Sequence, residues 1–100
     1  MSHVRRLVLD VLKPHQPTML ILADKLGDLE GVQGVDISLL EIDSKVENIK
    51  ITLEGTDIDF QEVSEVVQES GGSIHSIDKV STGKRLIEEV ETPQDAGWPR

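Results

Sequence analysis

The order in which two hydrophobic periods follow one another is the feature that most limits how this chain can fold. Residues 3–13 (HVRRLVLDVLK) alternate apolar and polar, which is typical of a strand, whereas residues 17–30 (PTMLILADKLGDLE) repeat at helical spacing. Two more alternating runs, GVQGVDISLLEID and NIKITLEG, are separated by a short polar break and predict a hairpin. The helical run IDFQEVSEVVQESGG and the strand-like GSIHSIDKV complete the series.

The second helical run carries signals for both of its ends. Asp59 and Glu62 form a capping box, and Ile58 and Val63 form a hydrophobic staple across it. Gly71 stands where a glycine after the last helical turn is expected. A helix between these signals turns four apolar side chains inward, namely Phe60, Val63, Val66 and Val67.

The resulting order, strand, helix, strand, strand, helix, strand, predicts an α+β fold with the βαββαβ pattern of ferredoxin-like domains. Right-handed crossovers then give an antiparallel sheet in the order 4-1-3-2, with both helices on one face and the other face open. Residues 1–85 form this domain. Residues 86–100 (LIEEVETPQDAGWPR) are acidic, contain two prolines and show no sustained period, so we expect a C-terminal tail.

Composition narrows the function classes. The 100 residues suit one domain, and with one Phe, one Trp and no Tyr the core must be aliphatic. The absence of cysteine excludes disulfides, thiolate zinc sites and cysteine nucleophiles. A net charge of -9 would repel a phosphate backbone, so we expect no nucleic-acid partner. No run of 18 apolar residues occurs, and we expect a cytoplasmic protein without a membrane partner.

This chain lacks the residues that several activities known for ferredoxin-like domains require. A copper carrier needs cysteines in the first loop, where this chain has KPHQP. An RNA-recognition sheet needs aromatic residues on its first and third strands, and these strands are aliphatic and charged. Acylphosphatase-like chemistry needs an arginine cradle in the first loop, and KPHQP contains no arginine. An ACT-like, amino-acid-sensing regulatory domain remains open, although Pro14 and Pro17 replace the glycine that such modules favour.

The open face of the predicted sheet is more aliphatic than a solvated surface should be. Burial of such a face between copies predicts a homo-oligomer. The alternative is a monomer in which the tail folds back through Leu86, Ile87 or Trp98. The predicted interface consists of Val8, Leu12, Leu40, Ile42 and Ile77.

Polar groups gather at the end of the sheet where strand one, the hairpin turn and the start of strand four meet. Asp10, Lys13, His15 and His75 form a candidate ligand-binding set there. The hairpin carboxylates Glu41, Asp43 and Glu47 have the oxygen chemistry of a Ca²⁺ or Mg²⁺ site, with a solvated acidic hairpin as the simpler interpretation.

His75 lies in a segment without clean alternation. Ile74 and Val80 fall on one face of a regular strand, and Ile77 falls on the other. Either a bulge shifts the register or both faces contact protein, and we favour contact on both faces. Ser76 and His75 point to opposite faces of a strand, so they cannot form a hydrolytic pair.

Three segments resemble an archaeal family, the domain-of-unknown-function family 211. They are LVLDVLKPHQP, EIDSKVENIKITLEG and HSIDKVSTG, which span most of the domain without the tail. The resemblance implies a ferredoxin-like archaeal protein without an assigned activity, similar to members that form ring-shaped homo-oligomers.

We therefore expect a small oligomeric binding or regulatory domain rather than an enzyme, with a small-molecule ligand of unknown identity. Two alternatives remain. One is a Ca²⁺- or Mg²⁺-binding protein that uses the hairpin carboxylates, and the other is an enzyme that uses the end of the sheet with His15 and His75.

Overall fold

The computed structural model describes residues 3–87, and its elements follow the predicted order. The expectations for Trp98 and for the tail beyond residue 87 concern residues outside this range. Within them, neither helix has the length and apolarity that a membrane span requires. The elements are β1 (Val4–Pro14), α1 (Met19–Gly27), β2 (Val32–Ile42), β3 (Val46–Gly55), α2 (Phe60–Glu69) and β4 (Ser73–Thr82).

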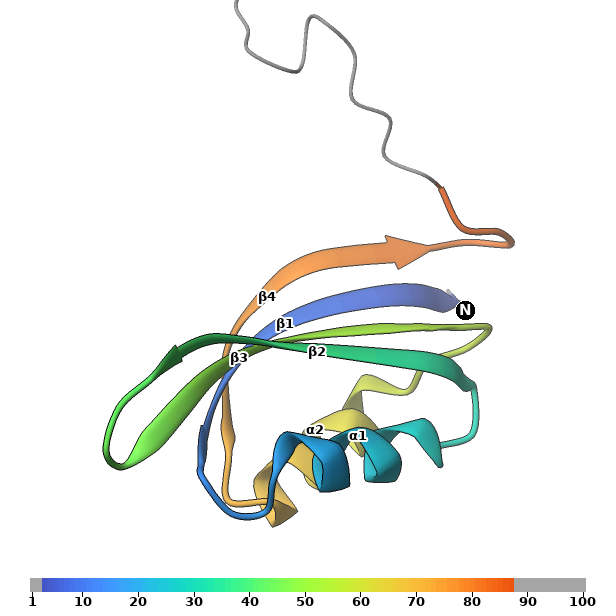
Figure 1. Ribbon diagram of the computed structural model, residues 1–100. Coiled ribbons are helices and arrows are strands. Elements are labelled where there is room, and N and C mark those ends of the chain that lie inside the picture. Colours follow the sequence, from blue (N-terminus) through green and yellow to red (C-terminus); the bar gives the residue numbers. More distant parts are fainter. Residues whose placement is uncertain (1–2, 88–100) are drawn as a thin grey trace, which may run out of the picture.

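The four strands form one antiparallel sheet in the order β2-β3-β1-β4, which is the predicted order read from the other edge. Both helices lie under one face of this strongly curved sheet, and the opposite face is open (Figure 1). β2 and β4 are therefore the two edges. The expected ferredoxin-like α+β fold is confirmed.

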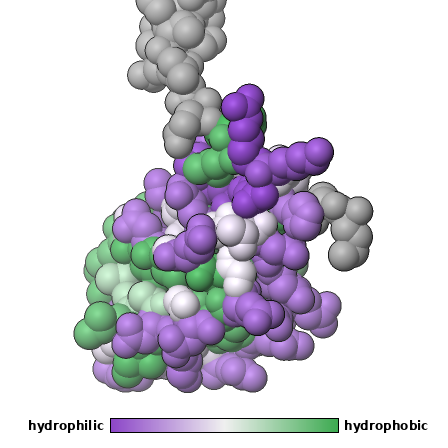
Figure 2. All heavy atoms as spheres, turned by 90° about the vertical axis from the view of Figure 1, so that its right-hand side faces the viewer, coloured by the Kyte–Doolittle hydropathy of each residue, from purple (hydrophilic) through white to green (hydrophobic). Residues whose placement is uncertain are grey.

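The core lies between the sheet and the helices. Directly opposed strand residues share a face, and the register pairs Leu7 with Leu53 and Leu9 with Ile51. Hydrophobic surface also remains outside this core, gathered along the flank that carries β2 and α1 (Figure 2). The buried hydrophobic residues are Leu7, Leu9, Val11, Leu22, Leu26, Ile49, Ile51, Leu53, Ile58, Val63 and Val67.

The helix boundaries follow from their caps. The Asp59 side chain accepts hydrogen bonds from the backbone amides of Gln61 and Glu62, and Gly71 adopts a φ of 81° just after α2, as predicted. α1 is shorter than expected, since it begins after the N-cap Thr18 and ends at Gly27. Both helices are short, so tertiary packing rather than intrinsic propensity must stabilise them.

β4 contains bulges, which is the alternative that we did not favour from the sequence. Its pairing with β1 shifts register three times, because His75 and Asp78 on β4 and Arg5 on β1 are each left without an opposite residue. Each β4 bulge adds one residue, so Ile74, Ile77 and Val80 fall opposite Val11, Leu9 and Leu7 and all turn to the helix side. The assignment of Ile77 to the open face is corrected by the same register.

The α2 cap gives a direct stability test. Asp59→Ala should lower the free energy of unfolding by about 1 kcal/mol, because two amides of the first turn lose their acceptor. Chemical denaturation followed by circular dichroism measures this change. Glu65→Ala, in the exposed middle of the same helix, is the matched control. Equal losses in the two variants would contradict the role of the cap.

Candidate functional site

A buried ion pair joins the end of β1 to the β2–β3 hairpin. Lys13 lies opposite Glu47 in the register, and its side chain is 0% exposed. The ammonium donates to Glu47 Oε1 at 3.1 Å and to the carbonyl oxygen of Pro14 at 2.7 Å. A buried charge requires such compensation, so the pair fixes the position of the hairpin over the end of β1.

His15, in the β1–α1 loop, completes this cluster. Its Nδ1 lies 3.0 Å from Glu47 Oε2, and its Nε2 lies 3.0 Å from the backbone carbonyl oxygen of Asp43. A carboxylate and a carbonyl can only accept, so both contacts are satisfied together when the imidazole carries two protons. The hydrogen bond to Glu47 accordingly raises the pKa of His15, with a smaller contribution from the Asp43 carbonyl.

The side chain of Asp43 forms hydrogen bonds within the hairpin turn itself. Asp43 Oδ1 accepts from the backbone amides of Lys45 and Val46, each at 2.8 Å. These bonds, that of Val46 first, lower the pKa of Asp43. The pKa of Glu47 is lowered chiefly by its hydrogen bond with His15 and further by Lys13, against the opposing effect of burial.

The chemical consequence is a closed network. Lys13, His15, Asp43 and Glu47 form their hydrogen bonds with one another or with the local backbone. In the part of the chain that the structure describes, no three His, Cys, Asp or Glu side chains converge as metal ligands. We interpret the cluster as a latch that holds the loop and the hairpin together.

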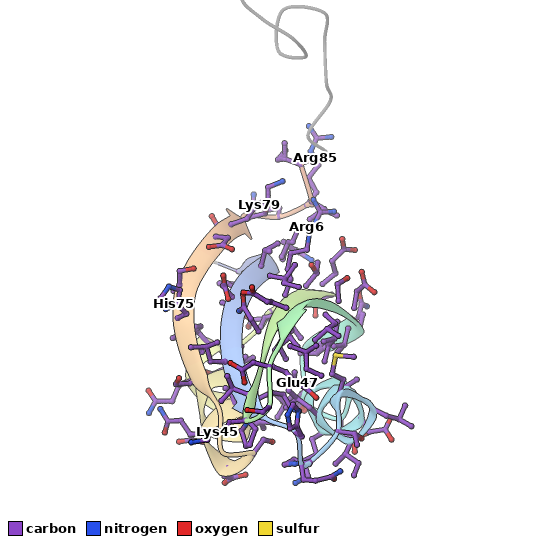
Figure 3. All side chains as sticks on the ribbon, turned by 60° about the vertical axis from the view of Figure 1, so that its left-hand side comes forward. Arg6, Lys45, Glu47, His75, Lys79 and Arg85 are labelled. Carbon is purple, nitrogen blue, oxygen red and sulfur yellow. The ribbon has the colours of Figure 1, made fainter. Side chains whose placement is uncertain are left out.

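The structure divides the predicted ligand-binding set. Lys13 and His15 lie together, but Asp10 lies on the open face, where the side-chain amide of Asn48 donates to it and to the Val11 carbonyl oxygen. His75 is exposed on its bulge in β4, well away from Glu47 (Figure 3). The two histidines do not form one site.

A shallow pocket of about 200 Å³ opens beside the hairpin. Its lining mixes apolar walls with the carboxylates of Glu41 and Asp43 and the amide of Asn48. Val46 and Asn48 were not predicted from the sequence, because Asn48 lies among the other polar residues of an alternating strand and nothing in the pattern distinguishes it. The full lining is Leu12, Glu41, Ile42, Asp43, Val46 and Asn48.

Four predicted interface residues lie near this pocket or on the same sheet. Val8 is half-buried and Leu12 is exposed, while Leu40 and Ile42 remain 52% and 56% exposed. A register shift between Leu39 and Glu41 leaves Leu40 without an opposite residue and sets Ile42 opposite Glu47. Glu47 pairs with Lys13 on the helix side, so the assignment of Ile42 to the open face is corrected. The aliphatic surface is thus wrapped around the hairpin end rather than spread over the whole face.

Comparison with known proteins adds a family and a close relative. A family described as uncharacterized ArCR, the domain-of-unknown-function family 211, matches residues 5–96. The uncharacterized protein MJ0319 of Methanocaldococcus jannaschii is 52% identical over 95 residues, which cover 95% of this chain and 98% of the relative. Neither description assigns an activity.

The buried pair predicts an asymmetric response to mutation. Glu47→Gln should reduce the free energy of unfolding by about 3 to 5 kcal/mol, because it leaves the Lys13 ammonium buried without its counter-charge. The double variant Lys13→Met with Glu47→Gln should regain a large part of this loss. Urea denaturation of both proteins measures the difference, and a double variant as unstable as Glu47→Gln would contradict the pairing.

The latch also predicts a pH dependence. The folded pKa of His15 lies above its ordinary 6.5, so its stabilisation is present below pH 6.5 and is lost as pH rises through the folded value. The folded pKa of Glu47 lies below its ordinary 4.5, so its stabilisation is present above pH 4.5 and is lost on acidification. The latch therefore stabilises most between these two values.

Melting temperatures measured from pH 4 to 9 test this dependence. The excess of wild type over His15→Gln should be largest between the ordinary pKa values of Glu and His and should shrink at alkaline pH. His75→Gln, which changes an exposed histidine on the β4 bulge, is the control and should follow the wild-type profile. A difference independent of pH would refute the charged latch.

Proposed function

The chain belongs to the domain-of-unknown-function family 211, and on that premise we propose that it is a small homo-oligomeric binding or regulatory domain. The proposal places the working surface on the exposed aliphatic residues and the shallow pocket at the hairpin end. It assigns the Lys13–Glu47–His15 cluster to the fold rather than to catalysis.

The observation that carries this proposal is the exposure of aliphatic residues around a pocket that holds polar groups. Leu12, Leu40, Ile42 and Val46 are each more than a third exposed. The last three belong to the hairpin strands β2 and β3, and Leu12 belongs to β1, which pairs with β3. Contiguous exposed apolar surface with a polar rim is typical of interaction sites. Burial between copies would remove it from water and would enclose the pocket.

The enclosed pocket would suit a small molecule with both an apolar part and a hydrogen-bonding or cationic group. Leu12, Ile42 and Val46 supply apolar contact, while Glu41 and Asn48 supply an acceptor and an amide. A net charge of -9 makes an anionic polymer a poor partner. We also propose a cytoplasmic location.

The two alternative functions have less support. An enzyme that uses His15 with His75 would need them in one cavity, whereas His15 lies in the β1–α1 loop beside Glu47 and His75 is exposed on a bulge of β4. A Ca²⁺ or Mg²⁺ site at the hairpin would need the oxygens of Asp43 and Glu47, which hold backbone amides, Lys13 and His15.

Light scattering coupled to size exclusion at micromolar concentration tests the assembly. The wild type should show a mass several times 11.0 kDa. Leu40→Lys with Ile42→Lys should lower that mass and leave the far-UV circular dichroism spectrum nearly unchanged, because both side chains are exposed. Gln61→Lys with Gln68→Lys makes the same charge change on exposed positions of α2 and should keep the wild-type mass. A wild-type monomer would overturn the proposal.

A further inference from the structure

The two edges of the sheet differ in their protection against pairing with another strand. β4 carries two bulges and the charged residues Asp78 and Lys79, which are devices that discourage edge-to-edge contact. β2 contains no Lys, Arg or Pro. It also has two register shifts, at Gln33 and Leu40, but they flank an unbroken stretch from Gly34 to Leu39 in which its pairing with β3 is regular. These residues, 34–39, form a regular and unprotected segment that we call the β2 edge strip.

The helix side of the β2 edge strip is incompletely covered. Val35, Ile37 and Leu39 lie opposite Leu53, Ile51 and Ile49. The β3 residues of these pairs are fully buried, whereas Val35 and Ile37 are only half-buried and Leu39 is 45% exposed.

The neighbouring helix α1 adds exposed aliphatic surface. It lies beneath β2 in the view of Figure 1 and carries Leu20, which is 74% exposed, and Ile21, which is 44% exposed. Hydrophobic surface is accordingly concentrated on this flank of the molecule (Figure 2). An edge with free backbone groups and an uncovered apolar side matches one kind of occupant, another strand with an apolar side of its own.

We propose that the β2 edge strip pairs antiparallel with the β2 edge strip of a second copy, about a two-fold axis at Ile37. The contact rests on the homo-oligomer proposed above and adds an interface separate from the hairpin end. It continues the sheet across two copies and brings the apolar flanks of β2 and α1 together on the helix side.

Side-chain matching selects this register. With the axis at Ile37, Ile37 faces its own copy and Val35 faces Leu39, so three apolar residues meet three apolar residues on one face. On the other face Asp36, the only charged residue of the strip, falls opposite Ser38. An axis at Asp36 would set two carboxylates opposite each other, and an axis at Val35 would set Ile37 opposite Gln33.

The chain contains no cysteine, so single-cysteine variants report this register directly. Directly opposed residues of an antiparallel pair have Cα atoms about 4.5 to 5.5 Å apart, which a disulfide can bridge. Ile37→Cys should therefore form a covalent dimer in more than roughly half of the chains under mild oxidation. Asp36→Cys alone and Ser38→Cys alone should each give less than roughly a tenth, because their like residues lie on diagonals of about 7 to 8 Å.

Oxidation of an equimolar mixture of Asp36→Cys and Ser38→Cys is the decisive test of the register. It should yield the mixed dimer, because these positions face each other across the axis. Ser76→Cys on β4 is the matched edge control. If Ile37→Cys cross-links no more than Ser76→Cys, or if Asp36→Cys cross-links with Ser76→Cys instead, the two-fold contact is refuted.

Failure of the β2 contact can be told apart from failure of the proposed homo-oligomer. A wild-type oligomer in light scattering without cross-linking at Ile37 would overturn only the β2 contact. A wild-type monomer would overturn both. Circular dichroism of the reduced Ile37→Cys protein establishes that the variant is folded before oxidation.

Discussion

The burial of the Lys13 ammonium is the constraint on which the hairpin end of this fold depends. A fully buried cation must be neutralised and hydrogen-bonded, and here Glu47 and the Pro14 carbonyl meet that need. Glu47 is thereby fixed in place and can hold His15, which in turn contacts the carbonyl of Asp43. One buried charge thus ties together the β1–α1 loop, the hairpin turn and the sheet.

The outer surfaces are shaped by irregularities in the strands. The bulges at His75 and Asp78 turn three apolar residues of β4 toward the helices and make that edge irregular. The shift at Leu40 wraps aliphatic surface around the hairpin end, and the regular stretch before it leaves β2 able to accept another strand. The contact proposed for β2 uses the longer regular stretch of the two sheet edges.

The sequence predicted the architecture well because its periods are strong and its caps are specific. Alternation placed Leu7, Leu9 and Val11 in the core, and the capping residue Asp59 and Gly71 set the limits of α2. The proximity of Lys13 to Glu47 could also be predicted, because strand order alone brings both residues to one end of the sheet. The bulges were not predictable in the same way, because a three-residue spacing of apolar side chains fits either two bulges or contact on both faces. The contacts of Asp43 and Glu47 with particular backbone amides and side chains were not predictable either, because sequence spacing does not contain that information.

Amide hydrogen exchange at high and low protein concentration tests most directly the claim that this protein acts through association at its outer surfaces. The account predicts that peptides covering residues 34–42 become protected as concentration rises, while peptides covering β4 exchange alike at both concentrations. Peptides that contain Lys13 and Glu47 should remain protected throughout, because their network is internal to each chain. Exchange of residues 34–42 that is rapid and independent of concentration would contradict the account.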